Sequence, residues 1–149
     1  MKLRSWQAEA FPLWWDKQQG IIKVVTGGGK TFFAIHCIKE YIKAFPEKDI
    51  LIVVPSIALL DQWNEALLEN NVNQEIVLNG GGEKVDKSAK IIVTTIDSLK
   101  NILGIVNAEN SLLIVDECHK IGTEKRGDML NNNWLSLIHI SEPTRPSII

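Results

Sequence analysis

The fold is most strongly indicated by the stretch Val24-Val25-Thr26-Gly27-Gly28-Gly29-Lys30-Thr31. It continues an apolar run typical of a buried strand and precedes a segment whose apolar residues have helical spacing. Glycines permit a loop whose successive backbone N–H groups point inward, and a helix N-terminus adds a partial positive charge. The stretch therefore predicts a phosphate-binding loop between a strand and a helix.

This loop has the residues needed to bind a nucleoside triphosphate. The Lys30 ammonium is expected to reach the β- and γ-phosphates and to act in catalysis, and the Thr31 hydroxyl is expected to coordinate Mg²⁺. The general pattern GxxxxGK[ST] has glycine at position 24, where this chain has Val24. A glycine-rich helix start with a surface lysine is the alternative. The residues expected to contact the nucleotide here are Thr26, Gly27, Gly28, Gly29, Lys30 and Thr31.

The apolar pattern on either side of the loop predicts an α/β domain. Five short runs rich in Ile and Val show little alternation, which is typical of strands covered on both faces. They are residues 21–25, 50–54, 75–78, 91–95 and 112–115. Residues 30–44 and 56–70 have the three- and four-residue spacing of helices. Strands alternating with helices indicate a mostly parallel sheet.

Composition limits the class of protein. The chain has 149 residues, of which 45% are hydrophobic and 23% charged, which is typical of one globular domain. No apolar run approaches the ~18 residues of a membrane-spanning helix, so a cytoplasmic location is expected. Cys37 and Cys118 are the only cysteines, and they form no pattern of a zinc or disulfide site. A net charge of −2 means that any binding to nucleic acid must be local.

A second motif lies at the end of the last of these apolar runs. Residues 111–115 lead directly into Asp116 and Glu117. Asp116 is expected to hold the shell of a Mg²⁺ ion, and Glu117 to orient or deprotonate an attacking water. Open parallel sheets bind ligands at the carboxyl ends of their strands, so both motifs can meet in one crevice.

Asp116-Glu117-Cys118-His119 resembles the DEAD/DEAH-box signature of superfamily 2 helicases, and the loop resembles the Thr-Gly-x-Gly-Lys-Thr form that this family uses. The resemblance implies an α/β P-loop NTPase domain of the RecA-like, three-layer kind, with ATP and Mg²⁺ as cofactors. It also implies that His119 couples the nucleotide site to a second domain.

The N-terminal segment Leu3-Arg4-Ser5-Trp6-Gln7-Ala8-Glu9-Ala10 is similar to the opening segment of the restriction-endonuclease-type and excision-repair-type branches of that family. In these branches the glutamine reads adenine, and Arg4 is assigned to the same nucleotide site. An amide can pair with N6 and N7 of adenine together, which gives Gln7 a physical basis for this role. A solvated glutamine on an amphipathic helix is the alternative.

Two further blocks resemble the family's nucleic-acid motifs. Residues 53–63 resemble motif Ia, with Ser56 in place of the usual threonine, and residues 94–99 resemble motif Ib. Ser56 could bind a backbone phosphate at a helix N-terminus, although helix capping explains it equally well. The residues that this resemblance assigns to nucleic acid, with DNA preferred over RNA, are Pro55, Ser56, Gln62, Thr94 and Thr95.

The tryptophans Trp14, Trp15 and Trp63 have helical spacing among apolar neighbours, which favours core packing over base stacking. The family's motif III and second RecA-like domain, which carries an arginine finger, do not appear in the sequence. We expect residues 1–134 to be an incomplete helicase ATP-binding domain. Residues 135–149 lack clean periodicity, and residues 135–146 resemble sequencing-adapter read-through, so the segment 135–149 is expected to be a non-native tail rather than a divergent strand.

The sequence therefore predicts the ATP-binding lobe of an ATP-dependent DNA helicase or translocase. Its expected partners are DNA and a second lobe in the same parent protein, with no membrane. Without that lobe the fragment is expected to bind nucleotide weakly and to turn it over poorly. A P-loop kinase or other NTPase that does not act on nucleic acid remains the rival enzyme class, and an inactive truncated module is the non-enzymatic alternative.

Overall fold

A computed structural model of the chain describes residues 5–17, 19–23, 29–80, 90–99, 102, 110–117 and 136–141. Within these ranges the backbone alone is described for residues 6, 19–23, 30, 117 and 136–141.

The described elements alternate between helix and strand along most of the chain. The helices are α1 (Ser5–Lys17), α2 (Lys30–Ala44) and α3 (Ile57–Glu69). The strands are β1 (Gln19–Lys23), β2 (Asp49–Val54), β3 (Ile76–Asn79), β4 (Ile91–Thr95), β5 (Ser111–Glu117) and β6 (Ser136–Ser141). The two helices and five strands expected from the sequence are confirmed, with bounds that differ by at most two residues.

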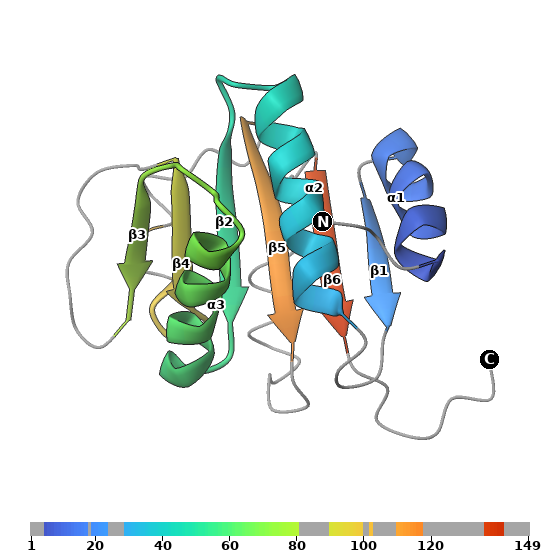
Figure 1. The fold of residues 1–149 in the computed structure, drawn as a ribbon. Helices are drawn as coiled ribbons and strands as arrows, with labels where there is room; N and C mark the ends of the chain where they lie inside the picture. The colour runs from blue at the N-terminus through green and yellow to red at the C-terminus, as the bar shows by residue number, and fades with distance from the viewer. Residues whose placement is uncertain are drawn as a thin grey trace.

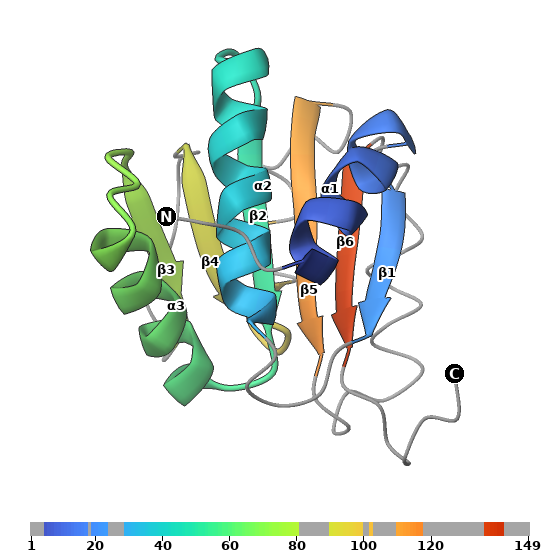
Figure 2. The ribbon, with the colours of Figure 1, turned by 45° about the vertical axis from the view of Figure 1, so that its right-hand side comes forward.

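The strands form one sheet in the order β1-β6-β5-β2-β4-β3, and every neighbouring pair is parallel. All strand arrows therefore point to the same edge of the sheet, as Figure 1 shows. Helices α2 and α3 begin at that edge and run back over the sheet (Figures 1 and 2). Strand, loop and helix start are thus brought together at the carboxyl edge, which is where the sequence places its candidate site.

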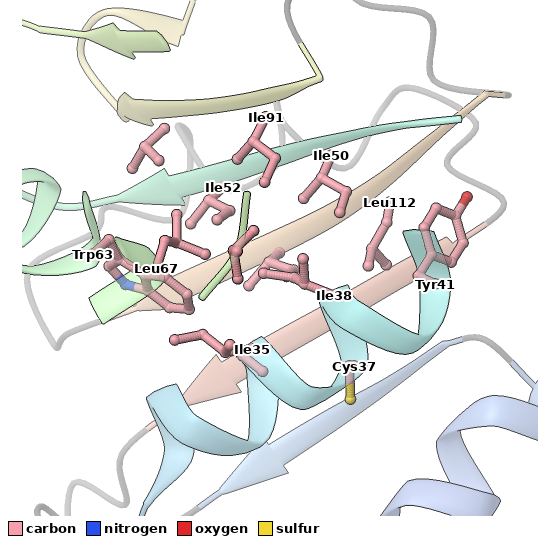
Figure 3. Close-up of a cluster of buried hydrophobic side chains, with 14 of the residues drawn as sticks. Ile35, Cys37, Ile38, Tyr41, Ile50, Ile52, Trp63, Leu67, Ile91 and Leu112 are labelled. Carbon is pink, nitrogen blue, oxygen red and sulfur yellow. The ribbon is translucent and has the colours of Figure 1, made fainter. Parts of the chain in front are cut away.

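The three described helices lie on one face of the sheet (Figures 1 and 2). Beneath them Ile35 and Ile38 of α2 and Trp63 and Leu67 of α3 pack with strand residues such as Ile52 in one buried cluster, part of which is drawn in Figure 3. Strands covered in this way need apolar residues at nearly every position, which explains the unbroken Ile and Val runs.

Aromatic side chains fix α1 against α2. Phe11 meets His36 edge to face with ring centroids 4.7 Å apart, and Trp15 stacks on Phe45 at 6.2 Å. Trp14 and Trp63 are 4% and 2% exposed, and Trp15 packs at the border of the same cluster. The expectation that these tryptophans belong to the core is confirmed.

The opposite face of the sheet carries a second, smaller cluster. Leu51, Val53, Ile92, Leu113 and Val115 point to this side, and Leu99 and Ile102 cover them. Alternate residues of β2 thus enter the two clusters, as the period of a strand requires. In the expected three-layer arrangement this face is covered by a second outer layer. Leu99 and Ile102 are the described residues that pack on it from outside the strands.

β6 differs from the expectation for the C-terminal segment. The sequence showed no clean periodicity after residue 134, yet Ser136–Ser141 forms a strand between β1 and β5. The physical reason is that an inner parallel strand is held by backbone hydrogen bonds on both sides, which demand little of side-chain alternation. The division into a domain at 1–134 and a non-native tail at 135–149 stays a prediction.

The sequence predicts a protein without membrane-spanning helices. No helix among the described residues is both long and apolar enough to cross a membrane. The cytoplasmic location stays a prediction of the sequence.

Cys37 is a free thiol with no exposed surface, and burial raises its pKa far above the usual range. This thiol is an inert core residue, as expected, and Cys118 lies outside the described residues.

Candidate functional site

The N-terminus of α2 follows a glycine in a left-handed conformation. Gly29 precedes the helix with a φ of 82° and a ψ of 23°, a left-handed conformation that favours glycine. Gly29 has no side chain with which to cap this end, and no acidic residue lies in the first turn of the helix. Because the first N–H groups of a helix need acceptors, this uncapped end suits an anion such as a phosphate.

Gln7 ties α1 to the same point. Its Nε2 donates a hydrogen bond of 3.0 Å to the carbonyl oxygen of Gly29, and the Gln7 side chain is fully buried. The structure therefore brings Gln7 to the last glycine of the predicted phosphate loop. The expected role in reading adenine stays a prediction, whereas the alternative of a solvated glutamine is wrong because this side chain is not exposed.

Asp116 lies at the carboxyl end of β5 with 2% of its surface exposed. Its Oδ2 accepts a buried hydrogen bond of 2.8 Å from the indole Nε1 of Trp63 on α3. A buried carboxylate is costly unless hydrogen bonds or charges compensate it, and a single indole donor supplies part of that compensation. Thr31, in the first turn of α2, is half-buried.

Strand register aligns the two predicted nucleotide motifs. Glu117 pairs with Ser141 of β6, and Ser141 pairs with Lys23 of β1. Lys23 is the last residue of β1, and the predicted phosphate loop follows it. The start of this loop and Glu117 therefore lie at the same height along the strands, on β1 and β5, with β6 between them. Neighbouring strands lie ~4.8 Å apart, which makes the lateral separation about 10 Å. A triphosphate with its metal can bridge that separation.

The predicted nucleic-acid motifs occupy the same edge. Ser56 is the N-cap of α3, and its hydroxyl accepts a hydrogen bond of 3.3 Å from Leu59 N. The backbone N–H of Ile96 donates to Val54 O at 2.9 Å, which joins the loops after β2 and β4. Pro55 is half-buried, and Ser56 and Gln62 are exposed. The helix capping that the sequence left open for Ser56 is thus observed.

The two threonines of motif Ib are used inside the protein. Thr94 is fully buried, accepts a hydrogen bond of 2.9 Å from Asn79 Nδ2 and donates one of 2.9 Å to Thr95 O. Thr95 is 6% exposed, and its hydroxyl accepts from Ser98 N at 3.3 Å. Neither hydroxyl lies open to solvent here, so their observed work is to shape the loop after β4.

Some of the expected site residues fall outside what the structure describes. These are Arg4, Thr26, Gly27, Gly28 and His119. Lys30 and Glu117 are placed by their backbones, at the first position of α2 and the last position of β5, and their side chains are not described.

The described residues suit a magnesium ion that takes some of its oxygen ligands from the protein and others from a bound nucleotide. Magnesium prefers oxygen ligands and is usually bound by one or two carboxylates together with phosphates and water. Asp116 and Thr31 offer such oxygens from two elements at one edge of the sheet. No group of three His, Cys, Asp or Glu in the described ranges could hold a metal by itself.

Two participating residues were missed from the sequence. Trp63 was assigned to packing alone, and Asn79 was given no role, although its Nδ2 also donates to Ser98 O at 2.9 Å. A usable signal existed for Trp63, because a buried indole needs an acceptor and a buried aspartate needs a donor. No local pattern pointed to Asn79.

The chain is similar in sequence to a known protein family and to a DNA translocase. The family model described as "Type III restriction enzyme, res subunit" matches residues 1–145. The DNA 3'-5' translocase XPB2 of Sulfurisphaera tokodaii is 35% identical over 124 residues, which cover 83% of this chain and 26% of that protein. The chain thus spans about a quarter of the length of this relative.

Solved structures show the same fold at low identity. The SWI2/SNF2 ATPase core domain of Sulfolobus solfataricus superposes with a TM-score of 0.79 at 18% identity, over 95% of this chain and 31% of that one. UvsW from bacteriophage T4 superposes with a TM-score of 0.77 at 20% identity, over 95% and 30%. The expected RecA-like α/β fold is therefore confirmed.

Proposed function

The chain belongs to the family of the type III restriction enzyme res subunit, and from this premise we propose that it is the ATP-binding lobe of a DNA helicase or translocase. The observation that carries the proposal is the shared carboxyl edge of the sheet. The uncapped start of α2 and the buried Asp116 both lie at this edge. The likeness to a protein named as a DNA 3'-5' translocase supports DNA as the polymer.

In this proposal each residue of the edge has one task toward ATP. The backbone N–H groups at the start of α2 and the Lys30 ammonium bind the phosphates. Thr31 and Asp116 hold Mg²⁺, which neutralises charge that develops on the phosphates when it is bound. Glu117 orients the attacking water and accepts its proton. Gln7 binds adenine from its place beside Gly29, with Arg4 at the same site.

Motifs Ia and Ib are proposed to hold the DNA backbone. Ser56 and the first N–H groups of α3 form an exposed helix N-terminus with no acidic residue in its first turn, which suits a phosphate. Pro55 and Gln62 flank it, and Thr94 and Thr95 shape the neighbouring loop. Such contacts touch the backbone and not base edges, so they suit an enzyme that moves along DNA of any sequence. His119 is proposed to relay the nucleotide state to a second lobe.

Nucleotide binding is tested by thermal unfolding of the chain with Mg-ATP, in wild type and in Lys30→Ala. At ten times its Kd a ligand adds about 1.4 kcal/mol to the free energy of unfolding, which raises Tm by a few degrees. We expect this rise in wild type and its loss in Lys30→Ala, with equal Tm values for both without ligand. An equal rise in both proteins would overturn the nucleotide site at this loop.

The rival, a P-loop NTPase that does not act on nucleic acid, is tested by filter binding to duplex DNA. Ser56→Ala and Thr95→Ala are expected to weaken DNA binding, and Ser56→Thr keeps the hydroxyl and is expected to bind like wild type. Because Ser56→Ala also removes a helix cap worth ~1 kcal/mol, its Tm is measured in parallel. Absence of DNA binding by the wild-type chain, or binding that neither Ser56→Ala nor Thr95→Ala weakens, would count against the nucleic-acid role and favour the rival.

A further inference from the structure

The hydrogen bond between Trp63 and Asp116 joins two motifs that lie 53 positions apart in the chain. Trp63 lies in α3, the helix that begins at motif Ia, and Asp116 is the next-to-last residue of β5 and the first residue of the DEAD/DEAH-like signature. Both side chains are 2% exposed. Figure 3 shows the Trp63 ring among the apolar side chains of the core, with its nitrogen at the border of that cluster.

The buried indole of Trp63 requires a hydrogen-bond acceptor, and Asp116 supplies it. An indole has one N–H donor and no acceptor, so a buried tryptophan is a costly core residue unless that donor finds a partner. Phenylalanine or leucine would fill the same apolar space without this cost. The distance of 2.8 Å lies in the range of hydrogen bonds to charged acceptors. The bond therefore restrains the position of the Asp116 Oδ2 atom.

Packing in the core holds the Trp63 ring in place. Leu60 and Leu67 on the same face of α3 are 4% and 0% exposed, and all three residues belong to the main core cluster. A ring packed in this way cannot follow the carboxylate if the carboxylate rotates. Orientation of metal ligands by such supporting groups typically changes metal affinity or activity by 10–100-fold.

We propose that Trp63 is a positioning residue for the metal site, and this inference rests on the proposed function, in which Asp116 holds Mg²⁺. The indole N–H holds Oδ2 of Asp116 and so presents the carboxylate to a Mg²⁺ ion in one orientation. Because Trp63 is two turns along the helix from Ser56, the same bond ties the proposed DNA-binding helix to the metal carboxylate.

The test uses the 149-residue chain and a fluorescent ATP analogue, with Mg²⁺ titrated at fixed nucleotide concentration. Trp63→Phe keeps an aromatic ring in the core and removes the N–H. Trp14→Phe makes the same change at another buried tryptophan of the same cluster and is the matched control. Asp116→Asn removes the carboxylate and reports on the proposed function itself.

We expect Trp63→Phe to raise the Mg²⁺ midpoint at least about tenfold while nucleotide binding in EDTA stays unchanged. Trp14→Phe is expected to keep the wild-type midpoint. A Trp63→Phe midpoint equal to that of Trp14→Phe, with Asp116→Asn still shifted, would overturn the positioning role alone. An unshifted midpoint in Asp116→Asn would overturn the proposed metal role of Asp116 and with it the inference.

A second measurement keeps the test independent of whether Trp63→Phe folds. In the ¹⁵N-labelled wild-type chain the indole N–H signal of Trp63, assigned through contacts to Leu60 and Leu67, reports on its acceptor. Addition of Mg²⁺ to the nucleotide-bound chain is expected to shift this signal and to leave that of Trp14 in place. An unmoved Trp63 signal at saturating Mg²⁺ and nucleotide would overturn the proposal.

Discussion

At the scale of single residues, buried polar side chains organise the carboxyl edge of the sheet. Gln7 donates to Gly29, Trp63 donates to Asp116, and Asn79 donates to Thr94 and Ser98. Each bond joins segments that are distant in sequence, and each donor is almost completely buried. Because a buried polar group costs free energy unless it is paired, these residues specify where the loops lie.

Asn79 offers a direct test at this scale. Asn79→Ala removes the donor to Thr94 Oγ1 and to Ser98 O, so we expect the free energy of unfolding to fall by about 1–3 kcal/mol. The midpoint of urea unfolding measures this loss. Asn73→Ala, the same substitution at an exposed position, is the control and is expected to stay within about 0.5 kcal/mol of wild type. Equal midpoints for the two variants would contradict a structural role for Asn79.

The sequence identified residues whose chemistry is local and missed those whose chemistry is distant. Gly29 and Thr31 were found because the phosphate loop has a fixed spacing, and Asp116 because a carboxylate pair ends an apolar strand. The donors Trp63 and Asn79 have no fixed spacing from their acceptors. Their partners are set by which strands become neighbours, and that depends on the whole sheet.

At the scale of elements, apolar patterns predicted strands and helices well because covered strands and amphipathic helices leave clear periods. Strands β2, β4 and β5 were found to within two residues, and α2 has the expected bounds. The pattern was less informative for α1, which continues through Pro12, a residue that normally ends a helix. Rings of α1 contact His36 of α2 and Phe45 at its C-cap, so packing holds α1 in place across this residue.

β6 is the element whose importance can be measured most directly. It supplies the backbone partners of both β1 and β5, so a chain ending at residue 134 would leave two strands with unpaired edges. We expect that truncation to abolish cooperative thermal unfolding or to cause aggregation. A chain ending at residue 141 keeps β6 and is expected to have the Tm of the full chain. Equal Tm values for the two truncations would show that β6 is dispensable, as a non-native tail would be.

At the scale of the whole molecule, the sheet gathers the candidate site residues at one edge, and its two faces carry separate buried clusters. The ends of β5, β2 and β4 lie in register, so Asp116, the loop after Val54 and the loop after Thr95 follow one another along the edge. A nucleotide at one end of this row and DNA at the other would share a single rigid sheet. This order was not readable from the sequence, because strand order depends on long-range pairing.

The proposed need for a second lobe leads to the last prediction. In related phosphoryl-transfer sites an arginine supplied by a second domain or partner is worth ~10³–10⁵ in rate. The 149 residues hold one lobe, so we expect Mg-ATP to bind while steady-state hydrolysis stays near background with or without duplex DNA. Phosphate release by the purified chain measures this, and Glu117→Gln serves as the control for contaminating ATPases. Hydrolysis that duplex DNA stimulates in wild type and not in Glu117→Gln would show that this lobe completes its own transition state, and the proposed dependence on a second lobe would then be wrong.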